Sequence, residues 1–61
     1  MIEVTKINGM KILVNPHWFE VVEETPYTVI TLTTGKKIIV KESRQEVKNL
    51  VELYRKDIFA D

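Results

Sequence analysis

The segment from Val22 to Ser43, VEETPYTVITLTTGKKIIVKES, constrains the fold of this chain more than any other. Thr25-Pro26 marks a turn, because proline restricts both its own backbone and the residue before it. The stretch that follows is rich in β-branched residues, and a glycine turn separates it from a second apolar run. This arrangement is typical of a β-hairpin. We therefore predict strands over 27–33 and 36–41.

A first hairpin is predicted over residues 2–14. Asn8-Gly9 lies between two runs in which apolar and polar residues alternate. Asn-Gly is a strong hairpin signal, because both residues tolerate the positive φ angles of a type I′ turn. The alternating apolar positions are Ile2, Val4, Met10, Ile12 and Val14.

Asn15-Pro16 ends this hairpin, because a proline cannot donate to a strand ladder. A further strand is predicted over 19–24. Simple alternation places Phe19 and Val21 on one face of that strand, together with Glu23.

A single helix is predicted over 44–59. Ser43 and Glu46 have the spacing of a capping box, in which each side chain bonds the backbone amide of the other residue. Glu52 and Lys56 have the spacing of an i,i+4 ion pair. One apolar stripe follows the helix, formed by Val47, Leu50, Val51, Tyr54 and Ile58. We therefore predict one α+β domain over 1–61, with about five short antiparallel strands and a C-terminal helix that covers one sheet face.

Length and composition exclude several ways of stabilising so small a domain. With 61 residues, the core is marginal, and such domains usually add disulfides, a metal or a partner. The chain has no cysteine and one histidine, which excludes disulfides, thiolate metal sites and a His-rich metal site. Oligomerisation, including a homo-oligomer, or docking on another protein is the remaining route.

Charge and hydropathy indicate which class of partner and which cellular location to expect. Nine Lys/Arg balance nine Asp/Glu, whereas nucleic-acid-binding proteins are usually basic, so nucleic acid is not the expected partner. No apolar run reaches the roughly 20 residues that span a bilayer. The start, MIEVTKING, lacks the features of a signal peptide, so we expect a cytoplasmic protein.

No group of residues forms a convincing catalytic or cofactor site. His17 is the one histidine and so the one candidate general base of this kind, and it has no partner for a triad. Glu20, Glu23 and Glu24 are close in sequence, but they alternate along a strand with no oxygen-rich loop nearby. We therefore expect no enzyme activity, no metal and no cofactor.

Surface residues offer better candidates. The basic residues Lys36, Lys37 and Lys41 either protect a sheet edge, bind nucleic acid with Arg44 and Lys48, or dock on an acidic protein or anionic lipid. The aromatic pair Trp18-Phe19 either fills the end of the core or contributes to an interface.

The chain resembles the FlbD/SwrD family of small bacterial flagellar and swarming motility proteins along nearly its whole length. The residues that carry this resemblance are I-x-VT-x-ING over 2–9, Asn15-Pro16, and above all VEETP-x-TVI-x-LT-x-GKK over 22–37, followed by VKES and Glu46-Val47.

The resemblance implies a non-enzymatic protein that supports flagellar motor power, or torque, by acting on the stator units. It implies a cytoplasmic location and allows one at the inner face of the membrane near the motor. The alternative is a small nucleic-acid-binding regulator of motility genes. The candidate partner-binding residues are Trp18, Glu23, Glu24, Lys36, Lys37 and Lys41.

Overall fold

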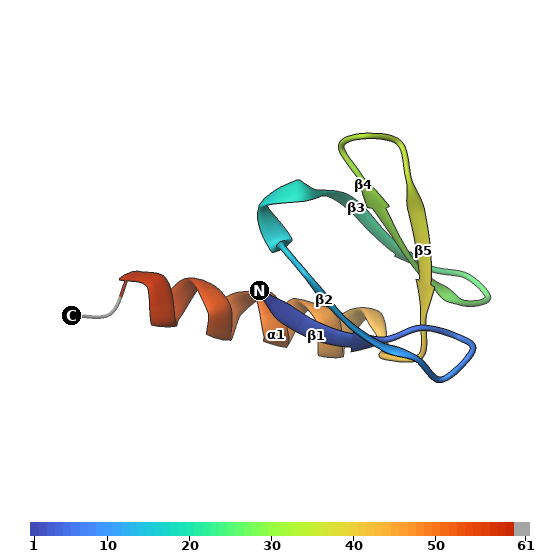
Figure 1. Ribbon diagram of the computed structural model, residues 1–61, viewed down its shortest axis with the longest axis horizontal. Coiled ribbons are helices and arrows are strands. Elements are labelled where there is room, and N and C mark those ends of the chain that lie inside the picture. Colours follow the sequence, from blue (N-terminus) through green and yellow to red (C-terminus); the bar gives the residue numbers. More distant parts are fainter. Residues whose placement is uncertain (60–61) are drawn as a thin grey trace.

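The protein folds as two small antiparallel sheets and one C-terminal helix (Figure 1). The computed structural model describes residues 1–59, with side chains through Asp57. The elements in chain order are β1 (Ile2–Thr5), β2 (Lys11–Val14), a 3-10 turn η1 (Pro16–Trp18), β3 (Phe19–Glu24), β4 (Thr28–Leu32), β5 (Lys37–Val40) and α1 (Arg44–Phe59). These elements confirm the predicted α+β class. β4 and β5 are each shorter than the strands predicted over 27–33 and 36–41.

The two sheets join where β1 ends. Lys6 forms an isolated antiparallel bridge with Val40. On either side of this bridge, the Lys41 amide donates to the Thr5 carbonyl at 2.8 Å and the Ile7 amide donates to the Ile39 carbonyl at 3.1 Å. The strands therefore follow one another in the order β2-β1-β5-β4-β3, as a curved and interrupted sheet.

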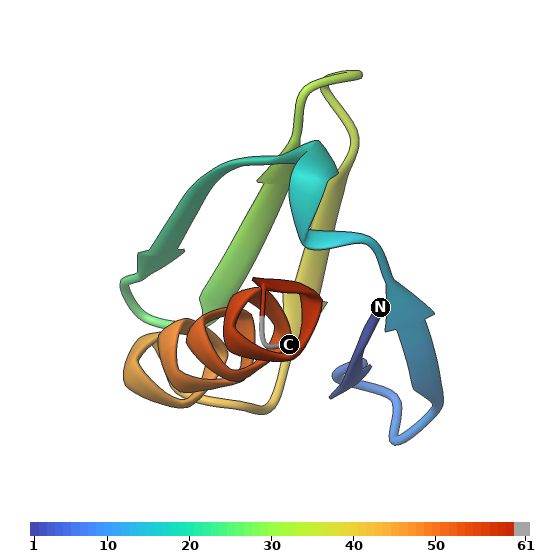
Figure 2. The same cartoon turned by 90° about the vertical axis from the view of Figure 1, so that its left-hand side faces the viewer.

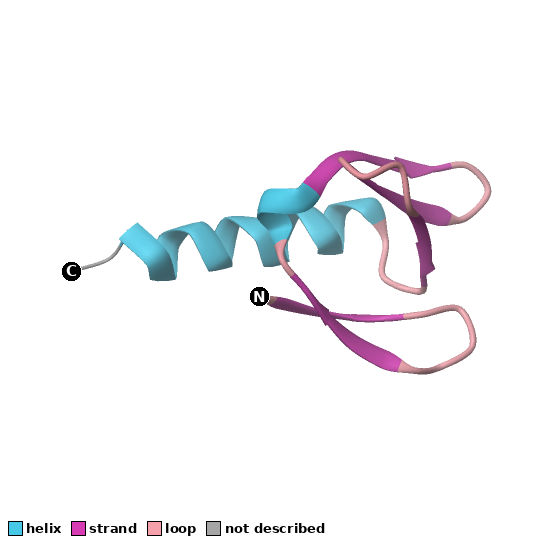
Figure 3. Cartoon of the chain, turned by 45° about the horizontal axis from the view of Figure 1, so that its top comes forward, coloured by secondary structure: helices cyan, strands magenta, loops and turns pink. Residues whose placement is uncertain are grey.

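The helix lies in the concave side of this curved sheet and contacts both β1 and β3. In Figure 2, where α1 is seen end-on, the β1–β2 hairpin and the three-stranded sheet lie on different sides of it. Figure 3 shows the same arrangement, with the last turns of the helix extending beyond the strands. The molecule is accordingly elongated, with extents of 38 × 22 × 19 Å.

Both hairpins use the same three-residue loop. In the first, the Gly9 amide donates to the Lys6 carbonyl and the Lys6 amide donates to the Met10 carbonyl, each at 2.8 Å. Gly35 and Leu32 make the equivalent bonds in the second hairpin. Gly9 has a φ of 91° and Gly35 a φ of 93°. Among the described residues, none other than glycine has a positive φ. The predicted type I′ turn is therefore wrong, because Asn8 keeps a negative φ and its side chain instead accepts a bond from the Met10 amide at 3.0 Å.

The core lies between the concave sheet face and α1. The buried apolar side chains are Ile2, Val4, Ile30, Ile38, Val40 and Val47. Leu50, Val51 and Tyr54 pack against them, as the helical stripe predicts, while the predicted Ile58 side chain lies outside the described part.

A bulge in β3 changes the predicted faces of that strand. The register between β3 and β4 shifts between Phe19 and Val21. As a result Phe19 and Val22 pack toward the core, whereas Val21 is exposed. The prediction that Phe19 and Val21 share a face is therefore wrong, because the extra residue at the bulge reverses the alternation.

Candidate functional site

The predicted site residues lie at two ends of the three-stranded sheet. Trp18, Lys36 and Lys37 are at the end that carries the β4–β5 turn, where the Thr33 amide donates to the Trp18 carbonyl at 2.8 Å. Glu23 and Glu24 face Val29 and Thr28 at the opposite end, and Thr28 pairs there with the last residue of β5. Lys41 follows directly. The strands thus separate the six predicted residues into two groups, roughly 14 Å apart along the sheet at about 3.4 Å per residue.

The convex face of this sheet carries an apolar patch that the sequence analysis did not identify. We call it the outer-face patch. Val29 and Ile39 are register neighbours, and Val21 lies on the same face, two residues before Glu23, which is the β3 partner of Val29. Ile7 lines the same shallow hollow as Ile39, Lys36 and Lys37. The members of the patch are Ile7, Val21, Val29 and Ile39.

Three members of the outer-face patch are well exposed. The exposed fractions are 52% for Ile7, 43% for Val21 and 40% for Ile39. A sheet with one solvated face usually has polar residues at the outward positions. Apolar residues at both parities of a strand, as in TVITL and KIIV, are the sequence signal that would have indicated this patch.

Charged side chains border the outer-face patch. Glu23 lies beside Val29 in the register, and Lys37 lies beside Thr31. Neither forms an ion pair in the described part of the chain, where the ion pair present joins Lys48 to Glu52 at 4.0 Å. The predicted partner of Glu52 was Lys56, so that pairing is wrong. Glu23 and Lys37 therefore keep their charges available to solvent or to a partner.

Glu24 has a different position from its neighbour Glu23. Its Oε1 accepts a hydrogen bond from the Arg44 backbone amide at 3.0 Å, across twenty positions of sequence. It thereby satisfies a free amide at the start of α1, where the helix dipole also favours a negative charge. Ser43 and Glu46 form the predicted reciprocal capping box with two bonds of 3.1 Å. The Glu24 carboxylate is thus held by the helix.

The aromatic pair Trp18-Phe19 is divided between surface and core. Trp18 is 55% exposed, whereas Phe19 packs against the buried cluster. His17, one residue earlier, makes an edge-to-face contact with Tyr54 at a ring-centroid distance of 5.8 Å. Trp18 therefore presents an exposed aromatic side chain that a partner can reach.

Glu42 is a titratable residue whose side chain stabilises the fold. The Glu42 Oε1 accepts the Thr5 amide at 2.8 Å and so ties the helix-proximal loop to β1. Partial burial raises the pKa of Glu42, but hydrogen bonds from Thr5 and from its own amide, with the charge of Lys11, lower that pKa below its ordinary 4.5. Within residues 1–59, no three His, Cys, Asp or Glu side chains gather in the manner of a metal site.

No helix among the described residues has the length and apolar character needed to cross a bilayer.

Comparison with known proteins gives the family. The chain matches the family model described as "FlbD: Flagellar and Swarming motility proteins" over residues 1–59, which is nearly all of its 61 residues. No curated protein and no solved structure matches it. The match agrees with the resemblance noted from the EETP and GKK segments of the sequence. The chain therefore belongs to the FlbD family of flagellar and swarming motility proteins.

Proposed function

We propose that this protein is a non-enzymatic interaction module that supports flagellar motor power by acting on the stator units. Membership of a motility family supplies the process. The outer-face patch supplies the single structural observation that supports a binding role. Its apolar side chains are exposed on a sheet face that α1 does not cover.

The chemistry around the outer-face patch suits recognition of another protein. Exposed aromatic side chains such as Trp18 are enriched among residues that dominate binding energies. Opposite charges on Glu23 and on Lys36 and Lys37 would orient a partner during encounter and suppress wrong partners. A contact of this kind requires neither a cofactor nor a reaction. We propose that the partner is a cytoplasmic part of the stator, reached at the inner face of the membrane.

The test is motor torque in tethered cells of the native host. Cells without the gene are expected to show lower torque at unchanged stator protein levels. The double variant K36E/K37E should reproduce that loss, because both lysines line the hollow that contains Ile7 and Ile39. Lys56→Glu, an exposed charge reversal on α1, is the matched control and should leave torque unchanged.

Two outcomes would contradict the proposal. Unchanged torque in the deletion strain would remove the motor role. Lower torque together with reduced stator levels would instead favour regulation of motility genes. That alternative predicts nucleic-acid binding that is detectable at about 50 mM salt and falls steeply as salt rises.

A further inference from the structure

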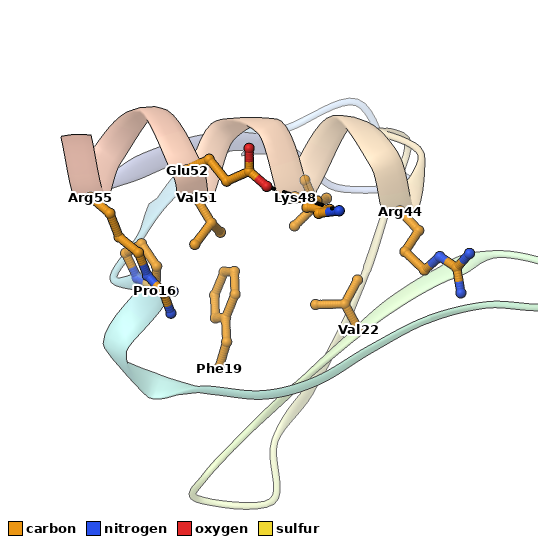
Figure 4. Close-up of a pocket in the computed structure, with 9 residues that line it drawn as sticks. Pro16, Phe19, Val22, Arg44, Lys48, Val51, Glu52 and Arg55 are labelled. Carbon is orange, nitrogen blue, oxygen red and sulfur yellow. Dashed lines mark ion pairs between the residues drawn. The ribbon is translucent and has the colours of Figure 1, made fainter. Parts of the chain in front are cut away.

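A groove lies between α1 and the edge strand β3, on the side of the sheet opposite the outer-face patch (Figure 4). Its volume is about 370 Å³. Phe19 and Val22 project into it from β3, and Val51 projects into it from α1. These side chains are half-buried and pack at the margin of the core, so the groove has an apolar floor that solvent reaches.

Basic side chains stand at both ends of this groove. Arg44 lies at one end and Arg55 at the other, as Figure 4 shows. About three helical turns separate them, which is roughly 16 Å at 1.5 Å per residue. Both are exposed, and neither forms an ion pair with another described residue. Lys48 lies between them and is paired with Glu52, so the groove margin has a net positive charge from the two arginines.

The strand that borders the groove has one unpaired edge. β3 pairs with β4 alone, and no strand covers its other side in the described chain. An edge strand presents backbone N–H and C=O groups that can pair with an extended chain. Peptides are recognised in this way when pockets beside the edge accept alternate side chains. Phe19, Val22 and Val51 form an apolar surface of that kind beside the β3 edge.

We propose that this groove binds an extended peptide segment with an apolar side chain in its middle and a carboxylate at each end, all three on the side of the peptide that faces the groove. An extended chain advances about 3.4 Å per residue, so the side chains of the first and fifth residues lie about 14 Å apart, close to the roughly 16 Å that separates the two arginines. The terminal carboxylates meet Arg44 and Arg55, whose planar guanidinium groups bind carboxylates in a bidentate manner. This inference does not depend on the role in motor power, because it concerns a different face of the molecule and different residues.

The test is a titration of the isotope-labelled protein with short peptides, followed by amide NMR shifts. Because successive side chains of an extended chain point to opposite sides, the probe is the acetylated and amidated peptide Glu-Thr-Val-Thr-Glu, whose two glutamates and central valine share one side. The control peptide is Lys-Thr-Val-Thr-Lys. At about 1 mM peptide, the glutamate peptide should shift the amides of β3 and of the facing turns of α1. The lysine peptide should shift none of them.

Matched protein variants separate the groove from the outer-face patch. Substituting both arginines with glutamine (R44Q/R55Q) should weaken binding of the glutamate peptide by about tenfold or more, since two charge-assisted contacts are lost. The K36E/K37E variant should bind it as the wild type does. Far-UV circular dichroism would confirm that both variants remain folded.

Three outcomes would overturn the proposal. The first is the absence of shifts with the glutamate peptide. The second is equal shifts with both peptides, which would make the attraction apolar only. The third is that the same amide signals shift when the protein concentration is raised in the absence of peptide. A second copy of this chain would then be the occupant of the groove.

Discussion

Glu42 is predicted to contribute about 2 kcal/mol to the free energy of unfolding, because it joins two parts of the sheet that are otherwise held by few bonds. Its Oε1 accepts the Thr5 amide at 2.8 Å across 37 positions of sequence. Replacement by alanine removes a charge-assisted bond and leaves a half-buried amide without its acceptor, which costs about 1–3 kcal/mol. A domain of 61 residues has a total stability of roughly 3–9 kcal/mol.

The assay is thermal unfolding followed by far-UV circular dichroism. At about 4–8 °C per kcal/mol for a domain of this size, Glu42→Ala should lower Tm by roughly 10 °C. Glu42→Gln keeps an oxygen acceptor but loses the charge, so we expect about half of that effect. Glu20→Gln is the matched control, since Glu20 is exposed, and it should leave Tm nearly unchanged.

The pH dependence of Tm separates the stabilisation that comes from the charge of Glu42 from the stabilisation that comes from its size and shape. Its pKa in the folded protein lies below the ordinary value of 4.5. A lowered folded-state pKa stabilises the fold at pH values above 4.5, and that contribution is lost as the pH falls through the folded-state pKa. The difference in Tm between wild type and Glu42→Gln should therefore shrink between neutral pH and about pH 3. A difference that stays constant with pH, or an unchanged Tm for Glu42→Ala, would refute this reasoning.

Three further predictions concern stability and can be measured by urea unfolding. Ile30→Ala should lower the free energy of unfolding by about 3 kcal/mol, because Ile30 is fully buried. Val29→Ala, on the outer face, should lower it by less than about 1 kcal/mol. Equal losses for the two variants would contradict the assignment of faces. Gly9→Ala and Gly35→Ala should each cost about 1 kcal/mol, since both positions have φ near 90° although nothing obstructs a Cβ there, and a neutral result would contradict the loop geometry. Ser43→Ala should cost about 1 kcal/mol through loss of the bond to the Glu46 amide, and an unchanged stability would show that the cap contributes nothing.

Features that depend on neighbours in sequence could be predicted well. The helix start follows from Ser43 and Glu46, which lie three residues apart and bond each other directly. The existence of both hairpins follows from Gly9 and Gly35, because the short loops that connect hairpin strands commonly need a residue that adopts positive φ. The loop type at Gly9 was not predictable from the Asn-Gly dipeptide alone, because a three-residue loop also uses glycine at its last position.

Features that join distant segments could not be predicted. The bond from Thr5 to Glu42 and the bridge from Lys6 to Val40 depend on how the two hairpins lie in space. The bulge after Phe19 has no glycine or proline to indicate it, yet it decides which side chains of β3 reach the core. For the same reason the exposure of Val21 appears only once the position of the bulge is known.

The six predicted site residues do not lie on one surface, and this separation has a physical cause. Nearness in sequence grouped Glu23 with Glu24, but successive residues of a strand point to opposite faces. Glu23 lies on the outer face beside Val29, whereas Glu24 is held at the helix start by the Arg44 amide. Changes at the two glutamates should therefore have different consequences. Glu24→Gln should lower stability through the helix cap, and Glu23→Gln should leave stability unchanged while altering partner binding.

This contrast gives a direct means of separating folding from function in motility assays. Glu24→Gln is expected to cost roughly 0.5–1 kcal/mol, because it removes a negative charge from the helix N-terminus while a neutral acceptor remains. Glu23→Gln should instead reduce motor torque with an unchanged Tm, since Glu23 borders the outer-face patch and makes no ion pair among residues 1–59. Measuring both properties in both variants tests the assignment. If torque followed Tm across the pair, the outer face would have no binding role of its own.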